Sequence, residues 1–491
     1  MRMVLEKVNH LNWTFEVSRK FCWFIEWGQI QANTKSNQIK YTGLSITSDN
    51  FMILNGDEYY LEDDLQSFYN FFDNKFNEDQ SFFEKFAKKI FDITENVENF
   101  RYYLEQINFK ELSNQELLKH LNQFSEMYVK SMIPAWVRPD MYLEERLSKE
   151  LPKNAIGKVT IPADLGELAY RDEPLKLMLT AQKIKEGKKI DKDIEFHVRN
   201  YAWQKGPITT EDVSFTKNDY LERIKLYLLK TNLDYEINRI RSERTKAEKE
   251  YKESIQKYTI HGKLLKLVEA LRTFIFLRTL TTESNEHLFQ ATKVALFKEI
   301  AKRAGLPFSV ILSLEPDEIA SCLDNKVSKQ NLVHLVKERQ KGFAIIWIQG
   351  KLAKRFGDEA VNLQNLVSKK YKKQKKAGSK DATNQIKGIC ASRGTAKGKV
   401  KVVFSNKDIP KVNKGDILVS SMINPDFVIA MEKAAAFVTD EGGITCHAAI
   451  VAREFGVPCI VGTVNATAIL RDGDLVEVHA DKGTIKILRN T

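Results

Sequence analysis

The segment 442–459, GGITCHAAIVAREFGVPC, constrains the fold of this chain more than any other. A strand-like run at 435–440 ends at its glycine pair, and small helix-forming residues follow until Gly456. Because glycine lets the backbone turn where a Cβ would clash, the pattern predicts a strand, a tight turn and a short helix. The free amide groups at the start of a helix favour a phosphate. His447, at that start, is therefore a candidate phosphoryl-accepting nucleophile.

Four neighbours of His447 complete the expected site. Thr445 is a preferred N-cap type, and it would either contact the phosphate or only cap the helix. Gly442 and Gly443 are expected to bind the phosphate, because a backbone without side chains can approach it closely. Arg453 lies six residues past His447, on the far side of a helix, and is interpreted as structural or as a domain-docking contact. The alternative for His447 itself is a structural histidine that caps a helix.

A longer stretch, residues 388–491, resembles the phosphohistidine (swivelling) domain of the PEP-utilising enzymes. That family includes PEP synthase, pyruvate phosphate dikinase and rifampicin phosphotransferase. The resemblance is carried by the stretches 388–398, 424–426, 434–440, 442–459 and 461–463. Arg393 stands where the family usually has proline. The resemblance implies a small α/β domain in which His447 forms a phosphohistidine intermediate.

The same resemblance implies a phosphotransferase of the dikinase type. PEP synthase and pyruvate phosphate dikinase also contain an ATP-grasp nucleotide domain and a pyruvate-binding barrel, and neither is recognisable in this sequence. We therefore expect a separate ATP-grasp nucleotide-binding protein as partner. Mg²⁺ would arrive with the nucleotide, because the sequence shows no metal cluster of its own. Whether ATP or PEP supplies the phosphoryl group stays open.

The acceptor is expected to be a small molecule bound by a helical domain, as in rifampicin phosphotransferase. His447 would take the phosphoryl group at one site and deliver it at the other. The alternative is a protein without turnover of its own, either a phosphocarrier or a regulatory adaptor.

The pattern along the chain predicts a multi-domain protein: a large, mainly α-helical domain followed by a small α/β domain. The expected parts are a mixed N-terminal segment at 1–60 that packs on the helical domain, the helical domain at 61–370, a basic flexible linker at 371–387, and the phosphohistidine domain at 388–491. The linker follows from the lysine-rich run at 369–376 and the small polar residues after it.

Three short signals support this division. Residues 21–25 and 51–54 read as strands, and Asn55-Gly56 after the second is a hairpin signal. Ser113 and Glu116 form a capping box at the start of a helix.

Composition excludes several other classes of protein. The start of the sequence has no secretory pattern, and no apolar stretch is long enough to span a membrane. Five scattered cysteines favour a reducing compartment. We therefore expect a cytoplasmic protein without a membrane partner. The net charge of +11 has no nucleic-acid-binding module beside it, so nucleic acid is not an expected partner.

Two pairs of residues upstream are candidate substrate contacts. His197 and Tyr201 are four residues apart and would share a helix face. They could form a general base beside an aromatic wall, although an aromatic core with a satisfied histidine is the favoured interpretation. Arg272 and Arg278 are charges within an apolar helix. They would bind phosphate or pair with nearby glutamates, and the sequence does not decide between these.

Overall fold

The computed structural model describes residues 8, 11, 13–18, 23–44, 50–163, 165, 166, 168–205, 214–229, 232–348, 350–375, 385–404, 406–423, 427–443 and 446–489. The chain divides into two compact units. The first contains Met1–Arg146 and Glu269–Ala377, and the second contains Leu147–Lys205, Ser214–Val268 and Gly378–Thr491. The predicted fold class is confirmed: a large helical part precedes a C-terminal α/β region.

The first unit contains an antiparallel sheet with the strand order β1-β3-β2-β4-β5. Its strands are β1 (Trp13–Ser18), β2 (Asn50–Leu54), β3 (Asp57–Leu61), β4 (Phe343–Ile348) and β5 (Lys351–Phe356). Strands from the two ends of this unit's sequence therefore pair, because β2 lies beside β4. The hairpin β4–β5 interrupts the helical domain expected at 61–370. The six consecutive residues of β4, FAIIWI, carry no helical periodicity.

The hairpin predicted at Asn55-Gly56 is confirmed. Leu54 pairs with Asp57 across a two-residue turn. Both turn residues have positive φ, 51° at Asn55 and 87° at Gly56, which is the conformation that favours Asn-Gly. The strand predicted at 21–25 is wrong for residues 23–25, since Trp23 begins a helix, and residues 21 and 22 lie outside the described part of the chain. A short apolar run does not distinguish a strand from a buried helix.

The helices of the first unit enclose an aromatic core. Phe24, Phe124, Tyr128 and Phe289 come from three different helices and are fully buried. Their ring centroids lie 5.4–6.5 Å apart. The helices of this unit are α2 (Trp23–Ala32), α3 (Lys35–Thr42), α4 (Glu62–Glu78), α5 (Phe82–Glu105), α6 (Asn114–Trp136), the π-helix η2 (Lys293–Phe297), α14 (Lys298–Ala304), α15 (Phe308–Ile311), α16 (Pro316–Leu323), α17 (Lys329–Lys341) and α18 (Asp358–Lys375). Most of α7 (Pro139–Glu150) and of α13 (Gly262–Thr292) also belongs to it.

Two features of these helices bear on the sequence predictions. The capping box at Ser113 and Glu116 begins α6, as expected. Among the residues described, none of the helices is both long enough and apolar enough to cross a membrane.

The second unit combines a group of helices with the C-terminal sheet. The helices are α8 (Lys153–Val159), α9 (Ala169–Lys185), α10 (Asp191–Tyr201), the 3-10 helix η1 (Ala202–Lys205), α11 (Lys217–Leu228) and α12 (Leu233–Lys257). Leu177, Ile194, Tyr220 and Ile237 are buried in one cluster that joins α9 to α12. The helical domain expected at 61–370 is thus shared between the two units, and its boundaries stay a prediction.

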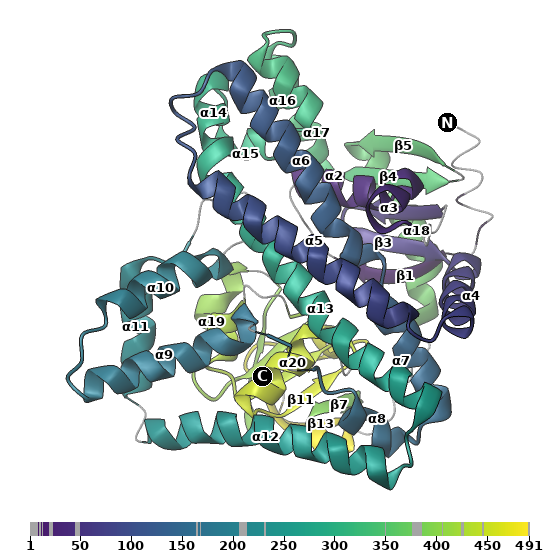
Figure 1. Cartoon of the computed structure of the whole chain (residues 1–491), viewed down its shortest axis with the longest axis vertical. Coiled ribbons are helices and arrows are strands. Elements are labelled where there is room, and N and C mark those ends of the chain that lie inside the picture. The colour runs from purple at the N-terminus through teal and green to yellow at the C-terminus, as the bar shows by residue number, and fades with distance from the viewer. Residues whose placement is uncertain are drawn as a thin grey trace. The chain divides into compact units, whose positions relative to one another are not determined.

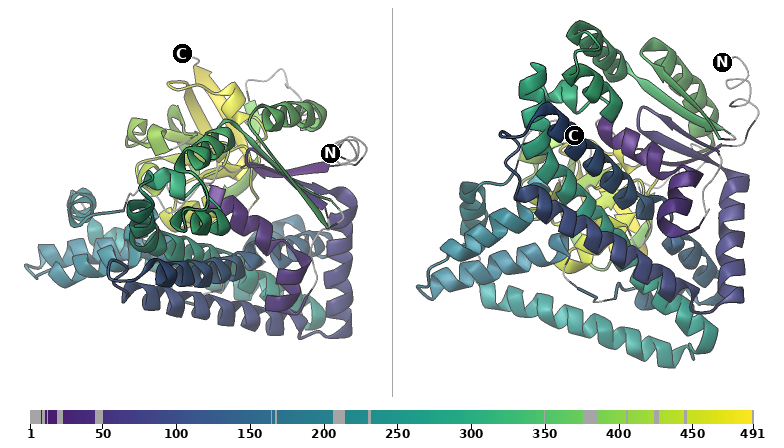
Figure 2. Two further views of the ribbon diagram at one scale, coloured as in Figure 1. Left: turned by 90° about the horizontal axis from the view of Figure 1, so that it is seen from above. Right: turned by 45° about the horizontal axis from the view of Figure 1, so that its top comes forward.

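The C-terminal strands, light green to yellow in Figures 1 and 2, form one eight-stranded sheet. The strand order is β6-β13-β12-β8-β9-β10-β11-β7, and the four strands from β8 to β11 are parallel. The elements are β6 (Gln385–Lys387), β7 (Ile389–Ser392), β8 (Thr395–Val402), η3 (Asn406–Lys411), β9 (Ile417–Ser420), α19 (Val428–Met431), β10 (Ala436–Thr439), α20 (His447–Phe455), β11 (Cys459–Val461), α21 (Ala466–Ile469), β12 (Leu475–His479), η5 (Ala480–Lys482) and β13 (Thr484–Arg489).

The linker predicted at 371–387 is shorter than its composition suggested. Residues 371–375 form the end of α18, because lysine and glutamine are good helix formers. Residues 385–387 form β6, which pairs with β13. The remaining residues, 376–384, lie outside the described part of the chain, so the predicted flexibility stays a prediction.

Gly398 provides a test of the packing of the C-terminal sheet. It pairs with Val476 on β12, and a Cβ at this position would lie 2.3 Å from the carbonyl oxygen of Gly415. We expect Gly398→Ala to lower the free energy of unfolding by about 1–3 kcal/mol, because the backbone must shift. Gly157→Ala in α8 is the matched control, since nothing lies within 4 Å of the added methyl group. The free energy of unfolding of Gly157→Ala should rise by up to about 1 kcal/mol. Urea denaturation measures the free energy of unfolding of both variants, and equal values would contradict this prediction.

Candidate functional site

The predicted strand, turn and helix around His447 are present. β10 ends at Thr439, and α20 begins at His447. Gly442 has a φ of 102°, in the region that favours glycine, and a Cβ there would lie 2.8 Å from the Sγ of Cys446. A glycine at this position therefore keeps the turn tight.

His447 is the first residue of α20, as predicted. The residue before it, Cys446, is the N-cap, so the prediction that Thr445 caps the helix is wrong. The helix starts two residues after Thr445, and the carbonyl of Cys446 accepts its first bond, from the Ile450 amide at 3.0 Å. Thr445 and the side chain of His447 lie outside the described part of the structure. Their chemical roles, and those of Gly442 and Gly443, stay predictions.

Asp440 holds the turn, and the sequence analysis missed it. One carboxylate oxygen accepts hydrogen bonds from the Thr463 hydroxyl and the Thr467 amide, both at 3.1 Å. The other accepts a bond from the Thr467 hydroxyl. The Val464 amide donates to the Asp440 carbonyl at 2.9 Å. The Asp440 carboxylate thus ties the end of β10 to the segment that follows β11. An acidic residue directly after a buried strand was the available signal.

A second set of contacts fixes α20 against the C-terminal sheet. Ala448, Ala449 and Ala452 are buried against the sheet. Arg453 donates to the Ala391 carbonyl on β7 at 3.3 Å, which fits the structural interpretation of this residue. Gly456 ends the helix with a φ of 63°. The helix that carries His447 is therefore held along its length by its own domain.

His197 and Tyr201 lie on one face of α10, as predicted, with ring centroids 5.7 Å apart. Both are buried in the core of the second unit, and the His197 ring also lies 5.3 Å from that of Tyr220. Thr180 Oγ1 is 3.4 Å from His197 Nε2. This is the aromatic-core arrangement that the sequence favoured. Whether either residue contacts a substrate stays a prediction.

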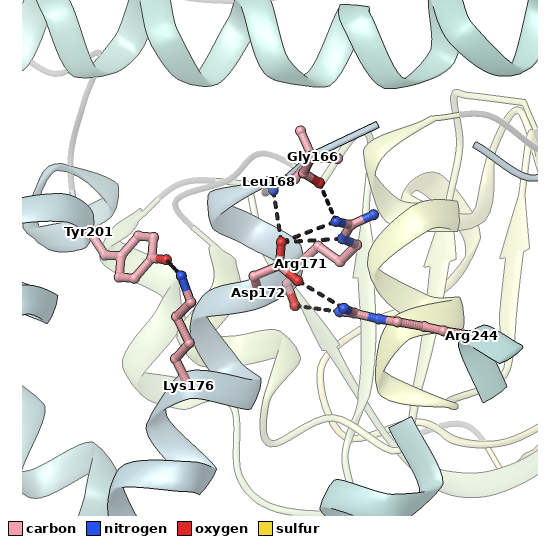
Figure 3. Close-up of polar contacts among 7 residues, drawn as sticks. All are labelled: Gly166, Leu168, Arg171, Asp172, Lys176, Tyr201 and Arg244. Carbon is pink, nitrogen blue, oxygen red and sulfur yellow. Dashed lines mark hydrogen bonds and ion pairs between the residues drawn. The ribbon is translucent and has the colours of Figure 1, made fainter. Parts of the chain in front are cut away.

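The pKa of His197 is lowered to about 4, mainly by burial and also by Arg223 and Lys176, against the opposing effect of Asp193. The imidazole is therefore neutral at neutral pH in the folded protein. The hydroxyl of Tyr201 accepts a hydrogen bond from Lys176 at 2.9 Å (Figure 3). The ammonium group of Lys176 also lies 4.9 Å from the centre of the Phe196 ring. Tyr201 on α10 and Lys176 on α9 are thus hydrogen-bond partners of each other.

The sequence analysis also missed an ionic cluster at the start of α9. Figure 3 shows the Asp172 carboxylate between the side chains of Arg171 and Arg244. Arg244 Nη1 donates to Asp172 Oδ1 at 2.9 Å, and the Leu168 amide donates to Oδ2 at 2.8 Å. Burial alone would raise the pKa of Asp172, but Arg171, the Leu168 amide and Arg244 together hold it below its usual value. The cluster joins α12 to the first turn of α9.

The second upstream pair lies in the first unit. Arg278 donates to Asp140 Oδ2 at 2.8 Å, and Arg138 binds the same oxygen at 3.1 Å. The ion-pair alternative is therefore present for Arg278, with an aspartate that the sequence analysis did not consider. Arg272 is buried. A role of either arginine in binding phosphate stays a prediction.

The depressed pKa of His197 predicts a pH dependence of stability. The unfolded chain binds a proton near pH 6.5, whereas the folded chain binds it only near pH 4. The neutral His197 ring makes its full contribution to the free energy of unfolding above pH 6.5, and this contribution is lost as the pH falls toward 4. Its loss at pH 5 is about 2 kcal/mol. We expect His197→Phe to flatten the fall in unfolding free energy between pH 7.5 and 5, measured by urea denaturation. His261→Gln, at an exposed histidine, should leave the slope unchanged. Parallel slopes for wild type and His197→Phe would contradict this assignment.

Comparisons with known proteins identify the C-terminal region. Residues 412–483 match the family described as "PEP-utilising enzyme, mobile domain". A "Probable phosphoenolpyruvate synthase" of Archaeoglobus fulgidus is 54% identical over 121 residues, covering 24% of this chain and 16% of that protein. The "Phosphoenolpyruvate synthase" of Pyrococcus furiosus is 54% identical over 100 residues, 20% of this chain and 12% of that protein.

A third relative is the "Uncharacterized phosphotransferase YvkC" of Bacillus subtilis, 42% identical over 109 residues, 22% of this chain and 13% of that protein. The aligned region thus spans only 12–16% of the length of these relatives. The match includes Asp440, His447 and Thr463. Residues 412–483 in the C-terminal region therefore match the mobile domain of PEP-utilising enzymes.

Proposed function

We propose that this protein is a phosphotransferase component in which His447 carries the phosphoryl group. The observation that supports this most directly is the position of His447 at the first residue of α20, inside the matched region 412–483. The family match supports a phosphotransferase-type role and a phosphohistidine intermediate. The helix start adds a physical reason, because its amide groups and partial positive charge favour a phosphate.

The chemistry has two balanced steps. A nitrogen of the neutral imidazole attacks phosphorus, and the bond from phosphorus to the donor oxygen breaks, leaving that oxygen with the electron pair. In the second step an oxygen of the acceptor attacks, the phosphorus–nitrogen bond breaks, and the acceptor proton passes to a base or to solvent. The imidazole then returns to its neutral form. The buried alanines and the Asp440 contacts keep the helix start in place throughout.

The donor site is proposed to lie on another protein, most simply an ATP-grasp nucleotide-binding protein. Mg²⁺ would come with the nucleotide and neutralise charge on the transferred group. Within the described residues, no group of three potential ligands is arranged to hold a metal ion. The acceptor is proposed to be a small molecule bound by the helical part of the chain, and the cytoplasm is the proposed location.

His447 can be tested against a histidine of the same domain. His447 and His479 are the two histidines in residues 388–491. We expect wild type and His479→Gln to gain one acid-labile phosphoryl group when incubated with the nucleotide-binding partner and Mg-ATP, whereas His447→Gln gains none. Intact-mass spectrometry before and after acid treatment measures this.

Two other outcomes are informative. Label retained by His447→Gln would show that the nucleophile is a different residue. A wild-type protein that gains no label from ATP is next incubated with PEP, and failure with both donors would favour the adaptor alternative.

A further inference from the structure

We propose that helices α9, α11 and α12 are a docking surface for the mobile domain, and that Glu432 bound to Arg223 is its main contact. This inference rests on the proposed function, since a carrier domain must leave any surface on which it docks. All of its residues lie in the second unit. They join two segments of the sequence that are about two hundred residues apart.

Arg223 on α11 is the centre of the contact. It is buried, with its side chain 7% exposed. Its guanidinium donates two hydrogen bonds to the Glu173 carboxylate on α9, at 2.5 and 2.8 Å. The nitrogen that makes the longer of these two bonds, Nη2, also donates to Glu432 Oε1 at 2.9 Å. Glu432 directly follows α19 of the mobile domain and also accepts a bond from the Tyr227 hydroxyl at 3.0 Å.

The geometry of this contact would allow Glu432 to leave while Arg223 stays paired. The Glu173 carboxylate binds both terminal nitrogens of Arg223 in a two-pronged ion pair inside the helices. Glu432 is a second acceptor, and its side chain is more exposed at 14%. When Glu432 leaves, Arg223 keeps its main partner. Undocking therefore avoids the large cost of leaving a buried charge unpaired.

Two further contacts extend the docking surface. Ile429 on α19 packs against the buried apolar cluster of α9 to α12. Arg239 on α12 donates to the carbonyl of Phe455 at 3.1 Å, at the carboxyl end of α20. A cation at this end matches the partial negative charge of the helix. A Cβ on Gly456 would lie 2.1 Å from Arg239 Nη1, so the guanidinium packs directly on the backbone there.

The docking surface thus holds the mobile domain at two of its helices. α19 and the residue after it supply an apolar side chain and a carboxylate, and α20 supplies a backbone carbonyl from the helix that begins with His447. The helices of the surface belong to the part of the chain that we propose to bind the acceptor. Docking there would place the carrier domain beside the acceptor side of the reaction.

Hydrogen exchange of the full-length protein, followed by mass spectrometry, tests this proposal. Glu432→Lys places a cation against Arg223 and should raise amide exchange in α11 and in residues 427–434 by about tenfold or more, since hydrogen bonds between charged groups are worth about that ratio. Glu432→Gln keeps the side-chain size and removes only the charge, so it should raise exchange less in the same segments. Lys225→Gln removes an exposed ion pair with Glu222 on the same helix and should change neither segment.

Each other outcome decides against the proposal. Unchanged exchange in Glu432→Lys would show that the contact does not hold the domain. A rise that includes β9 and β10 in both Glu432 variants would show that Glu432 stabilises its own domain instead. The readout needs no phosphoryl group, so it is independent of the labelling of His447. A protein that is never labelled but shows the predicted exchange would retain the docking surface and lose the proposed function.

Discussion

The parallel pairing of β9, β10 and β11 is the constraint on which the candidate site depends. Parallel strands present their carboxyl ends at one edge of a sheet, and loops at that edge are where α/β folds place their ligands. β10 lies between the other two strands, so the turn that follows it emerges at this edge. The residues after β11 emerge beside it, which lets Thr463 and Thr467 reach Asp440. The position of His447 thus follows from strand pairing as much as from its own helix.

The same domain uses two kinds of residue for two tasks. Along α20, alanines bring the helix close to the sheet. At Asp440, charged and hydroxyl groups fix the turn through bonds that depend on direction. Close packing resists compression but allows sliding, whereas hydrogen bonds to a carboxylate oppose sliding as well. The proposed nucleophile would meet a donor and an acceptor with the same geometry, which requires both kinds of contact.

Local patterns predicted the parts of the structure that local physics decides. The Asn55-Gly56 hairpin and the Ser113 capping box each involve four consecutive residues, and both are present. The helix start at His447 follows from the glycines before it. The failed predictions involve runs too short to show a period, such as 21–25, or a composition that suits two structures, such as the lysine-rich end of α18. Contacts between distant segments were beyond reach, because nothing near Glu432 in the sequence indicates Arg223.

The buried charges of the second unit explain how a domain can be held and still be released. A fully buried ion pair between a mobile domain and its surface would leave one charge unpaired on release, at a cost of several kcal/mol. Here that cost is avoided, because Glu173 and Arg223 both belong to the helical side and stay together. Only the more exposed member, Glu432, belongs to the mobile domain, and water can solvate it after release. Arg239 follows the same rule, since Glu236 and Glu243 on its own helix keep it paired when the Phe455 carbonyl leaves. The helices thus retain their ion pairs with or without Glu432 and the Phe455 carbonyl, as the proposed docking requires.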